Sequence, residues 1–153
     1  MPDQRDKPRD IKDRTFSFAV QIVGLCRKIE KYSDVYRTLG RQLLRSATSI
    51  GSNAEEAESG QSRADFVSKY AISLKEARES IYWLRLIQET FSAEELGVAE
   101  LIREGKEISK IIGAIIVNTK RQGSLREGEN NPAKRGNKEG KISGFAFLLF
   151  TCA

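Results

Sequence analysis

The chain has 153 residues, of which 39% are hydrophobic, enough to bury the core of one domain but not of two large ones. It contains no histidine, which excludes histidine general bases, Ser-His and Cys-His nucleophile pairs and histidine-ligated metal sites. The net charge of +5 is concentrated near the end, because residues 1–119 hold 19 Lys and Arg against 18 Asp and Glu, whereas residues 120–153 hold 7 against 3. A nearly neutral body does not by itself indicate a nucleic-acid-binding protein.

Residues 1–10 form a polar leader of alternating charge, without the apolar region of a signal peptide. No apolar run in the sequence reaches the roughly 18 residues that a membrane span needs. The two cysteines, Cys26 and Cys152, lie far apart, and the first falls in an apolar helical pattern that suits a buried thiol. These features predict a cytoplasmic protein in a reducing compartment.

The first predicted helix covers residues 11–31. Its predicted core face consists of Ile11, Thr15, Ala19, Ile22, Val23, Cys26 and Ile29. Ser33 and Asp34 are candidate N-caps of a second helix, over residues 35–59, because their short side chains can accept hydrogen bonds from the unpaired amides of a first turn. The predicted core face of this helix narrows along its length: Leu39, Leu43, Ala47, Ile50, Ala54 and Ala57. The small residues let a neighbouring helix approach closely.

A third helix is predicted over residues 64–90, preceded by Ser62 and Asp65 in the spacing of a capping box. Its predicted core face is the most regular in the chain: Phe66, Tyr70, Leu74, Ala77, Ile81, Leu84 and Phe91. The opposite side of the same helix carries a second apolar stripe, made of Ile72, Tyr82, Trp83 and Leu86. A soluble helix needs only one such stripe, so the second one requires its own explanation.

The second stripe predicts a contact with another copy of the chain. Single exposed apolar residues are ordinary, but four on one face favour an interface, and large aromatic side chains contribute strongly to such contacts. Lys75 and Glu79 lie beside the stripe, where they would fix the orientation of the subunits. The alternative is a solvated face on which charges four residues apart pair along the helix.

A fourth helix is predicted to extend to about Lys120, opened by Ser92 and Glu95 in a capping box. Its predicted core face is Val98, Leu101, Ile102, Gly105, Ile108, Ile112, Ile115, Ile116 and Thr119. Gly105 and Gly113 each lower helix propensity by about 1 kcal/mol relative to alanine, so this helix depends on tertiary packing. Four amphipathic helices with short connections predict an all-α, antiparallel up-down-up-down four-helix bundle over residues 11–121.

Residues 122–153 are rich in glycine, asparagine and charge and have no period, which predicts a flexible, disordered basic tail. The tail ends in the apolar stretch FAFLLFTCA, which is too short to span a membrane. This stretch is either an additional adhesive segment or a translated extension without a selected role.

Few residues suggest ligand chemistry. Arg41 and Arg45, four residues apart, are weak candidates for contacts to nucleic-acid phosphates, the alternative being a solvated pair that binds a neighbour such as Glu56. Asn53 is a poor helix former in mid-helix, and we expect it to bond an adjacent helix or subunit. Glutamates 55, 56 and 58 point in different directions on a helix and do not converge on one atom. We therefore expect no catalytic residues, no cofactor and no metal site.

The segment LLRSATSIGSNAEEAESGQSRADFVSKYAISLKEARESIYWLRLI resembles the four-helix-bundle family of proteins encoded in 23S rRNA intervening sequences, and EGKEISKIIGAIIVNTK fits it too. Relatives of that family include the accessory variability determinant proteins of diversity-generating retroelements. The resemblance covers most of residues 11–120 and is strongest at Arg45, Ser49, Gly51, Asn53, Glu56, Ala57, Ser62, Asp65, Phe66, Lys69, Lys75, Glu76, Glu79, Tyr82, Trp83 and Leu84.

The resemblance implies a bundle that assembles into a ring-like homopentamer and binds a reverse transcriptase and nucleic acid through a basic outer surface. We accordingly expect a non-enzymatic, homo-oligomeric adaptor whose partners are RNA or DNA, or a reverse transcriptase, and not a membrane. The alternative is a protein-binding scaffold without affinity for nucleic acid. An enzyme is a third and more distant hypothesis.

Overall fold

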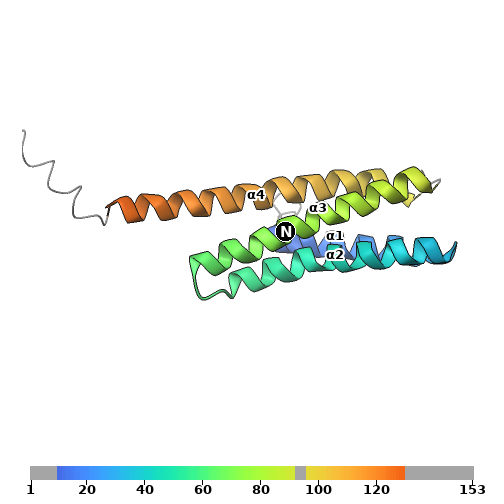
Figure 1. Cartoon of the computed structure of the whole chain (residues 1–153), viewed down its shortest axis with the longest axis horizontal. Coiled ribbons are helices and arrows are strands. Elements are labelled where there is room, and N and C mark those ends of the chain that lie inside the picture. Colours follow the sequence, from blue (N-terminus) through green and yellow to red (C-terminus); the bar gives the residue numbers. More distant parts are fainter. Residues whose placement is uncertain (1–9, 92–95, 130–153) are drawn as a thin grey trace, which may run out of the picture. The chain divides into compact units, whose positions relative to one another are not determined.

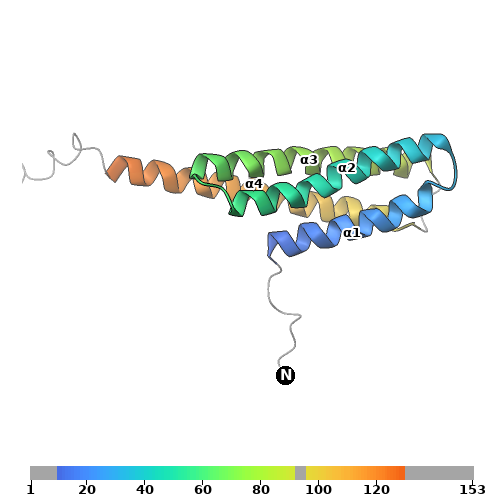
Figure 2. The ribbon, with the colours of Figure 1, turned by 90° about the horizontal axis from the view of Figure 1, so that it is seen from below.

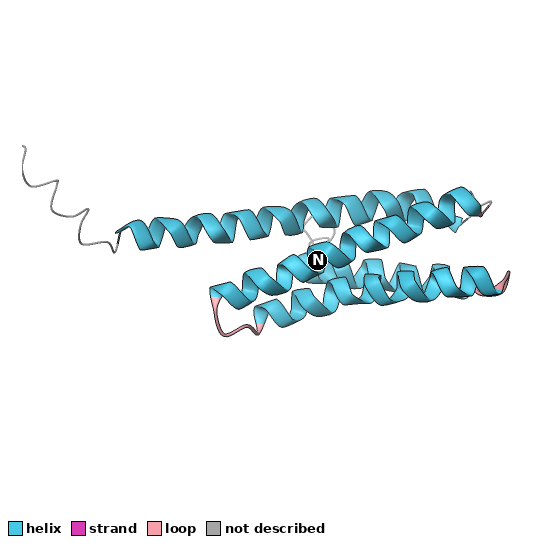
Figure 3. Ribbon diagram, viewed as in Figure 1, coloured by secondary structure: helices cyan, strands magenta, loops and turns pink. Residues whose placement is uncertain are grey.

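The computed structural model describes residues 10–91 and 96–129, and these residues fall into two units that divide between residues 119 and 120. The described residues form four helices, α1 (Ile11–Ile29), α2 (Asp34–Glu58), α3 (Arg63–Thr90) and α4 (Val98–Glu129), which Figure 1 labels in chain order. No strand occurs among these residues (Figure 3). The predicted all-α, antiparallel four-helix bundle is confirmed for residues 11–119.

Consecutive helices run in alternating directions within the bundle (Figure 2). Side-chain contacts place α1 between α2 and α4. On one flank, the Cys26 thiol of α1 donates to the carbonyl of Gly40 in α2. On the other, Arg14 of α1 forms an ion pair with Glu104 of α4.

Helix α3 also lies between α2 and α4. The Ser73 hydroxyl of α3 donates to the carbonyl of Ile50 in α2 over 2.8 Å. A Cβ built on Gly105 of α4 would lie 3.0 Å from Cγ1 of Ile81 in α3, so glycine lets these two helices approach each other. Since α1 and α3 share both neighbours, they occupy opposite corners of the bundle, and their outer faces point away from each other.

Side-chain caps start the first three helices. Asp10, Ser33 and Ser62 each accept a hydrogen bond from a backbone amide in the first turn of the following helix. The predicted caps at Ser33 and Ser62 are therefore confirmed. The predicted box of Ser92 and Glu95 lies outside the described residues.

Position 60, in the turn between α2 and α3, is crowded and favours glycine. A Cβ there would lie 2.7 Å from an Asp65 carboxylate oxygen and 3.0 Å from the carbonyl oxygen of Ala57. The Asp65 side chain could turn away, but the Ala57 oxygen belongs to the end of α2 and accepts from the Gly60 amide, so a side chain at position 60 would have to displace this backbone slightly.

The core face of α1 differs from the prediction. Four predicted members are buried, but Phe18 and Leu25 complete the core, while Ala19, Val23 and Cys26 are only partly buried. Apolar residues cover more than half of the circumference of this helix, so their period predicts a helix without determining which side faces inward. The consequence is that Phe16 and Val20 lie outside, 70% and 55% exposed.

Helix α4 also ends later than predicted, at Glu129 instead of about Lys120. The prediction assigned residues 122–129 to the tail because they are rich in glycine and charge and have no period, but single glycines such as Gly123 cost a helix only about 1 kcal/mol each and do not terminate it. The division of the chain into a leader, a bundle and a flexible tail stays a prediction, because residues 1–9 and 130–153 lie outside the described part. Among the residues that are described, no helix is long and apolar enough to cross a membrane.

Candidate subunit-contact surface

The seam between α2 and α3 sets the rotation of α3. Ser80 donates a hydrogen bond to Ser46 across the seam over 2.9 Å, and both hydroxyls are buried. Ser73 makes a second cross-helix bond to the backbone of α2, and Ala77 lies fully buried between these two serines. Buried polar groups require their partners, so these bonds hold one face of α3 against α2. The opposite face of α3, which carries the second apolar stripe, is thereby turned outward.

The second stripe is partly open and partly covered. Tyr82 and Ile72 remain 58% and 41% exposed, whereas Trp83 and Leu86 are half-buried. The rings of Tyr82 and Trp83 meet edge to face, with their centroids 5.0 Å apart and an interplanar angle of 73°. Trp83 therefore lies along the edge of α3 that packs on the core, and Tyr82 projects from the outer side.

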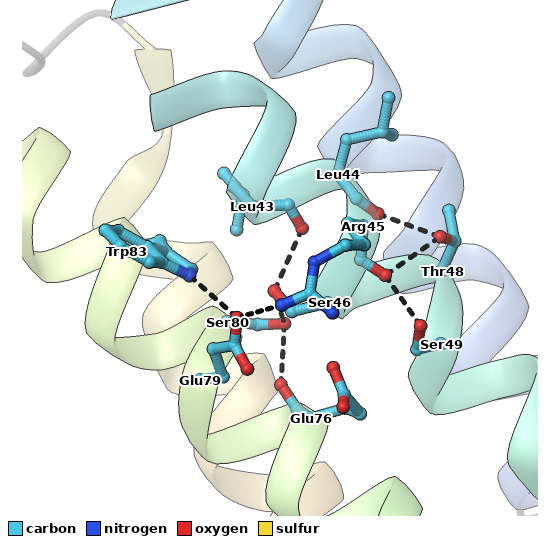
Figure 4. Close-up of polar contacts among 10 residues, drawn as sticks. All are labelled: Leu43, Leu44, Arg45, Ser46, Thr48, Ser49, Glu76, Glu79, Ser80 and Trp83. Carbon is cyan, nitrogen blue, oxygen red and sulfur yellow. Dashed lines mark hydrogen bonds and ion pairs between the residues drawn. The ribbon is translucent and has the colours of Figure 1, made fainter. Parts of the chain in front are cut away.

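Glu79 connects the stripe to α2. One of its carboxylate oxygens accepts a hydrogen bond from Nη2 of Arg45 over 2.6 Å and another from the Trp83 indole over 3.2 Å (Figure 4). The sequence suggested Glu56 as a neighbour for Arg45, but Glu56 pairs with Lys69 of α3 and raises the pKa of that ammonium group. The antiparallel register brings residue 45 level with residue 79, about three helical turns away from the level of Glu56.

Other polar residues singled out in the sequence form fewer contacts. Lys75 and Arg41 are exposed, and neither forms an ion pair with another described residue, so Lys75 does not pair with Glu79 along the helix. Asn53 was expected to bond an adjacent helix, but its amide donates to the carbonyl of Ser49 in its own helix over 2.8 Å. Short polar side chains in mid-helix commonly bond back to the carbonyl four residues earlier. A bond between Asn53 and another subunit stays a prediction.

The described residues include no group of three or more side chains arranged to hold a metal ion. An open depression lies at the turn between α2 and α3, where Glu55, Glu56 and Asp65 surround Lys69. Its only cation is already paired with Glu56. The depression therefore holds no cation that is free to bind an anionic ligand.

Cys26 is protected by its surroundings. Its thiol bonds to the carbonyl of Gly40 over 3.3 Å, and burial, followed by the charge of Glu30, raises its pKa from 9.0 to about 11. The thiolate is the reactive form. We expect the native thiol to react with iodoacetamide about 100-fold more slowly at pH 8 than the thiol of the unfolded chain, with a rate that rises with pH up to about 11. Mass spectrometry of the Cys26 peptide measures both rates, and equal rates would contradict this assignment.

The sequence prediction missed a second exposed apolar surface, which lies on α1. Phe16 and Val20 follow each other at a spacing of four residues on its outer side, next to Gly24, which has no other atoms near its side-chain position. The spacing of Phe16, Val20 and Gly24 was a usable signal. The surface was missed because Phe16 and Val20 were not assigned to any face of the predicted helix.

Comparisons with known proteins agree with this fold. The model of a protein family described as 23S rRNA-intervening sequence protein matches residues 8–114. A similar solved structure is that of a protein with unknown function from the S23 ribosomal protein family of Bacteroides thetaiotaomicron VPI-5482. It is 41% identical, the match covers 70% of this chain and 98% of that chain, and the TM-score is 0.63. No curated protein matches the chain.

Proposed function

Since the chain belongs to the 23S rRNA-intervening sequence protein family, we propose that it is a non-enzymatic adaptor that assembles with copies of itself through the outer face of α3. The observation that carries the proposal is the exposure of Tyr82 and Ile72 beside the half-buried Trp83 and Leu86. The inner face of α3 already packs fully within the chain, through residues such as Leu84. Tyr82 and Ile72 therefore keep apolar surface that no other described residue of the chain covers.

The contacts around Glu79 support an interface role for this face. Its carboxylate holds the Trp83 indole, and Trp83 in turn packs against the Tyr82 ring. Side chains that are held in place before binding lose little conformational entropy when a partner covers them. Tyrosine and tryptophan are enriched among the residues that contribute most of the binding energy at protein contacts.

Sedimentation velocity of the full chain tests the assembly. We expect a particle several times the 17.2 kDa mass of one chain, with the pentamer implied by the family resemblance as the specific expectation. In that particle the single tryptophan should be poorly accessible to a water-soluble quencher such as acrylamide. A 17.2 kDa monomer at micromolar concentration would contradict the proposal.

We further propose that the assembly binds nucleic acid or a nucleic-acid enzyme such as a reverse transcriptase. The body of the chain is nearly neutral, so binding depends on a local patch repeated around the assembly, and Arg41 with Arg45 is the candidate patch on α2. Arg41 is exposed and has no ion pair among the described residues. Arg45 must share its guanidinium with Glu79, so Arg41 is expected to contribute more.

Replacing Arg41 and Arg45 with alanine should weaken the retention of structured RNA or duplex DNA in a gel shift. Loss of two phosphate contacts should also reduce the slope of log affinity against log salt by about 1.8 for duplex DNA. Measurements at two salt concentrations give this slope. The double variant Arg103→Ala/Lys106→Ala on α4 is the matched control, because it removes two exposed positive charges from another helix. Equal effects of both variants would show that only net charge matters.

A protein-binding scaffold without affinity for nucleic acid is the second candidate function. The ion pair between Arg45 and Glu79 favours it, because it uses one of the two candidate phosphate donors inside the protein. The gel shift distinguishes the two functions. If the chain assembles but retains neither RNA nor DNA at low salt, the result identifies it as a protein-binding scaffold.

A further inference from the structure

Two exposed columns of side chains run along opposite corners of the bundle. The α1 column consists of Asp13, Val20 and Arg27, and the α3 column consists of Lys75, Tyr82 and Glu89. The members of each column are seven residues apart, so they follow one side of their helix at intervals of about 10.5 Å. All six residues are exposed, and none of the four charged ones forms an ion pair with another described residue.

We propose that the α1 column of one copy packs in parallel against the α3 column of a second copy. This inference rests on the proposed function, in which the outer face of α3 is a subunit contact, and it names the surface that this face meets.

The charges of the two columns are complementary in one direction only. A parallel alignment places Asp13 opposite Lys75, Val20 opposite Tyr82, and Arg27 opposite Glu89. An antiparallel alignment of the same columns places acid opposite acid and base opposite base, which is unfavourable. The order of the charged residues along the two columns therefore favours the parallel contact.

The shapes of the two faces also fit each other. Beside Val20 the α1 face carries the 70%-exposed Phe16 and also Gly24, where no atom lies within 4 Å of a built Cβ. That glycine leaves space for a large ring such as Tyr82 close to the helix backbone. The α3 face adds apolar surface in Leu86, one turn after Tyr82, and in Ile72, one turn before Lys75.

The positions of α1 and α3 explain why the contact joins unlike faces. The two helices occupy opposite corners of the bundle, so one chain cannot cover both of its own columns. They also run in the same direction, as the alternating order of the helices requires (Figure 2). A parallel contact between α1 of one copy and α3 of the next therefore leaves both bundles pointing the same way. A symmetric contact of α3 with α3 would leave Phe16 and Val20 uncovered.

Mixing two variants of the full chain tests this pairing. Val20→Glu disables the α1 column and Tyr82→Glu disables the α3 column, and each variant alone should sediment as a monomer. A 1:1 mixture should form a species of two chains, because the first variant keeps an intact α3 column and the second an intact α1 column. Val117→Glu on α4 is the matched control, since Val117 is 53% exposed and lies in neither column, and it should assemble normally. Circular dichroism checks that each variant is folded.

The outcomes separate this inference from the proposed function. If Val20→Glu assembles like the unmodified chain while Tyr82→Glu does not, α3 is an interface but α1 is not its partner, and only the inference fails. If the Tyr82→Glu variant assembles normally, or the unmodified chain is a monomer, both fail. Formation of the two-chain species only in the mixture supports both.

Charge reversal provides an independent test of the alignment. Lys75→Glu should weaken assembly, and Asp13→Lys in the same chain should restore it, because the two residues face each other across the contact. Glu89→Lys should not restore it, since Glu89 is expected to face Arg27. In a symmetric contact of α3 with α3 centred on Tyr82, Glu89→Lys would rescue the Lys75→Glu variant instead, and that result would overturn the inference.

Discussion

Replacing Tyr82 with glutamate is expected to convert the assembled protein into monomers. The Tyr82 ring is 58% exposed in the chain and would be covered in the assembly, where a carboxylate would lose its hydration without gaining a partner. An aromatic anchor at the centre of an interface is worth at least about 2 kcal/mol, so the dissociation constant should rise at least about 30-fold. Sedimentation velocity over a range of protein concentrations measures the change.

Tyr82→Phe is the matched control for this substitution. It keeps the ring and its edge-to-face contact with Trp83 and removes only a hydroxyl. The variant should assemble nearly as well as the unmodified chain. Loss of assembly in both variants would show that the hydroxyl, not the apolar ring, carries the contact, and normal assembly of Tyr82→Glu would remove the outer face of α3 from the interface.

Replacing Phe18 with alanine is expected to cost about 3–5 kcal/mol of folding free energy, whereas Phe16→Ala should cost no more than about 0.5 kcal/mol. The two rings are two residues apart on α1. Phe18 is fully buried, and its Cζ would lie 3.7 Å from a Cβ built on Gly105, so its loss leaves a cavity at the contact of α1 with α4. Phe16 is 70% exposed and leaves none.

Both phenylalanine substitutions are best measured by urea unfolding in the Tyr82→Glu background. Assembly adds stability by mass action, and a monomeric background removes that contribution from both variants. The expected result for Phe18→Ala is a lower unfolding midpoint at an unchanged dependence on urea. Equal losses from the two substitutions would show that α1 is rotated from the position described above.

Local features of the sequence were sufficient to predict the four helices and two of their caps. Ser33 and Ser62 cap helices through bonds to amides only three residues away, so the neighbouring sequence contains all the required groups. Helical period is equally local, since residues three and four apart share a face whatever the rest of the chain does. The second apolar stripe of α3 was visible from the sequence for the same reason.

The tertiary structure alone decided which groups meet between helices. The partner of Arg45 is Glu79, 34 residues later, and that pairing depends on the register in which α2 and α3 pack. Packing also chose the rotation of α1, which buries Phe18 and exposes Phe16 although both are equally apolar. Sequence by itself determined where helices form, because helices are made by bonds between near neighbours. Which apolar faces stay exposed to bind a partner was decided only by the packing of the four helices around one core, because that core has room for one face of each helix.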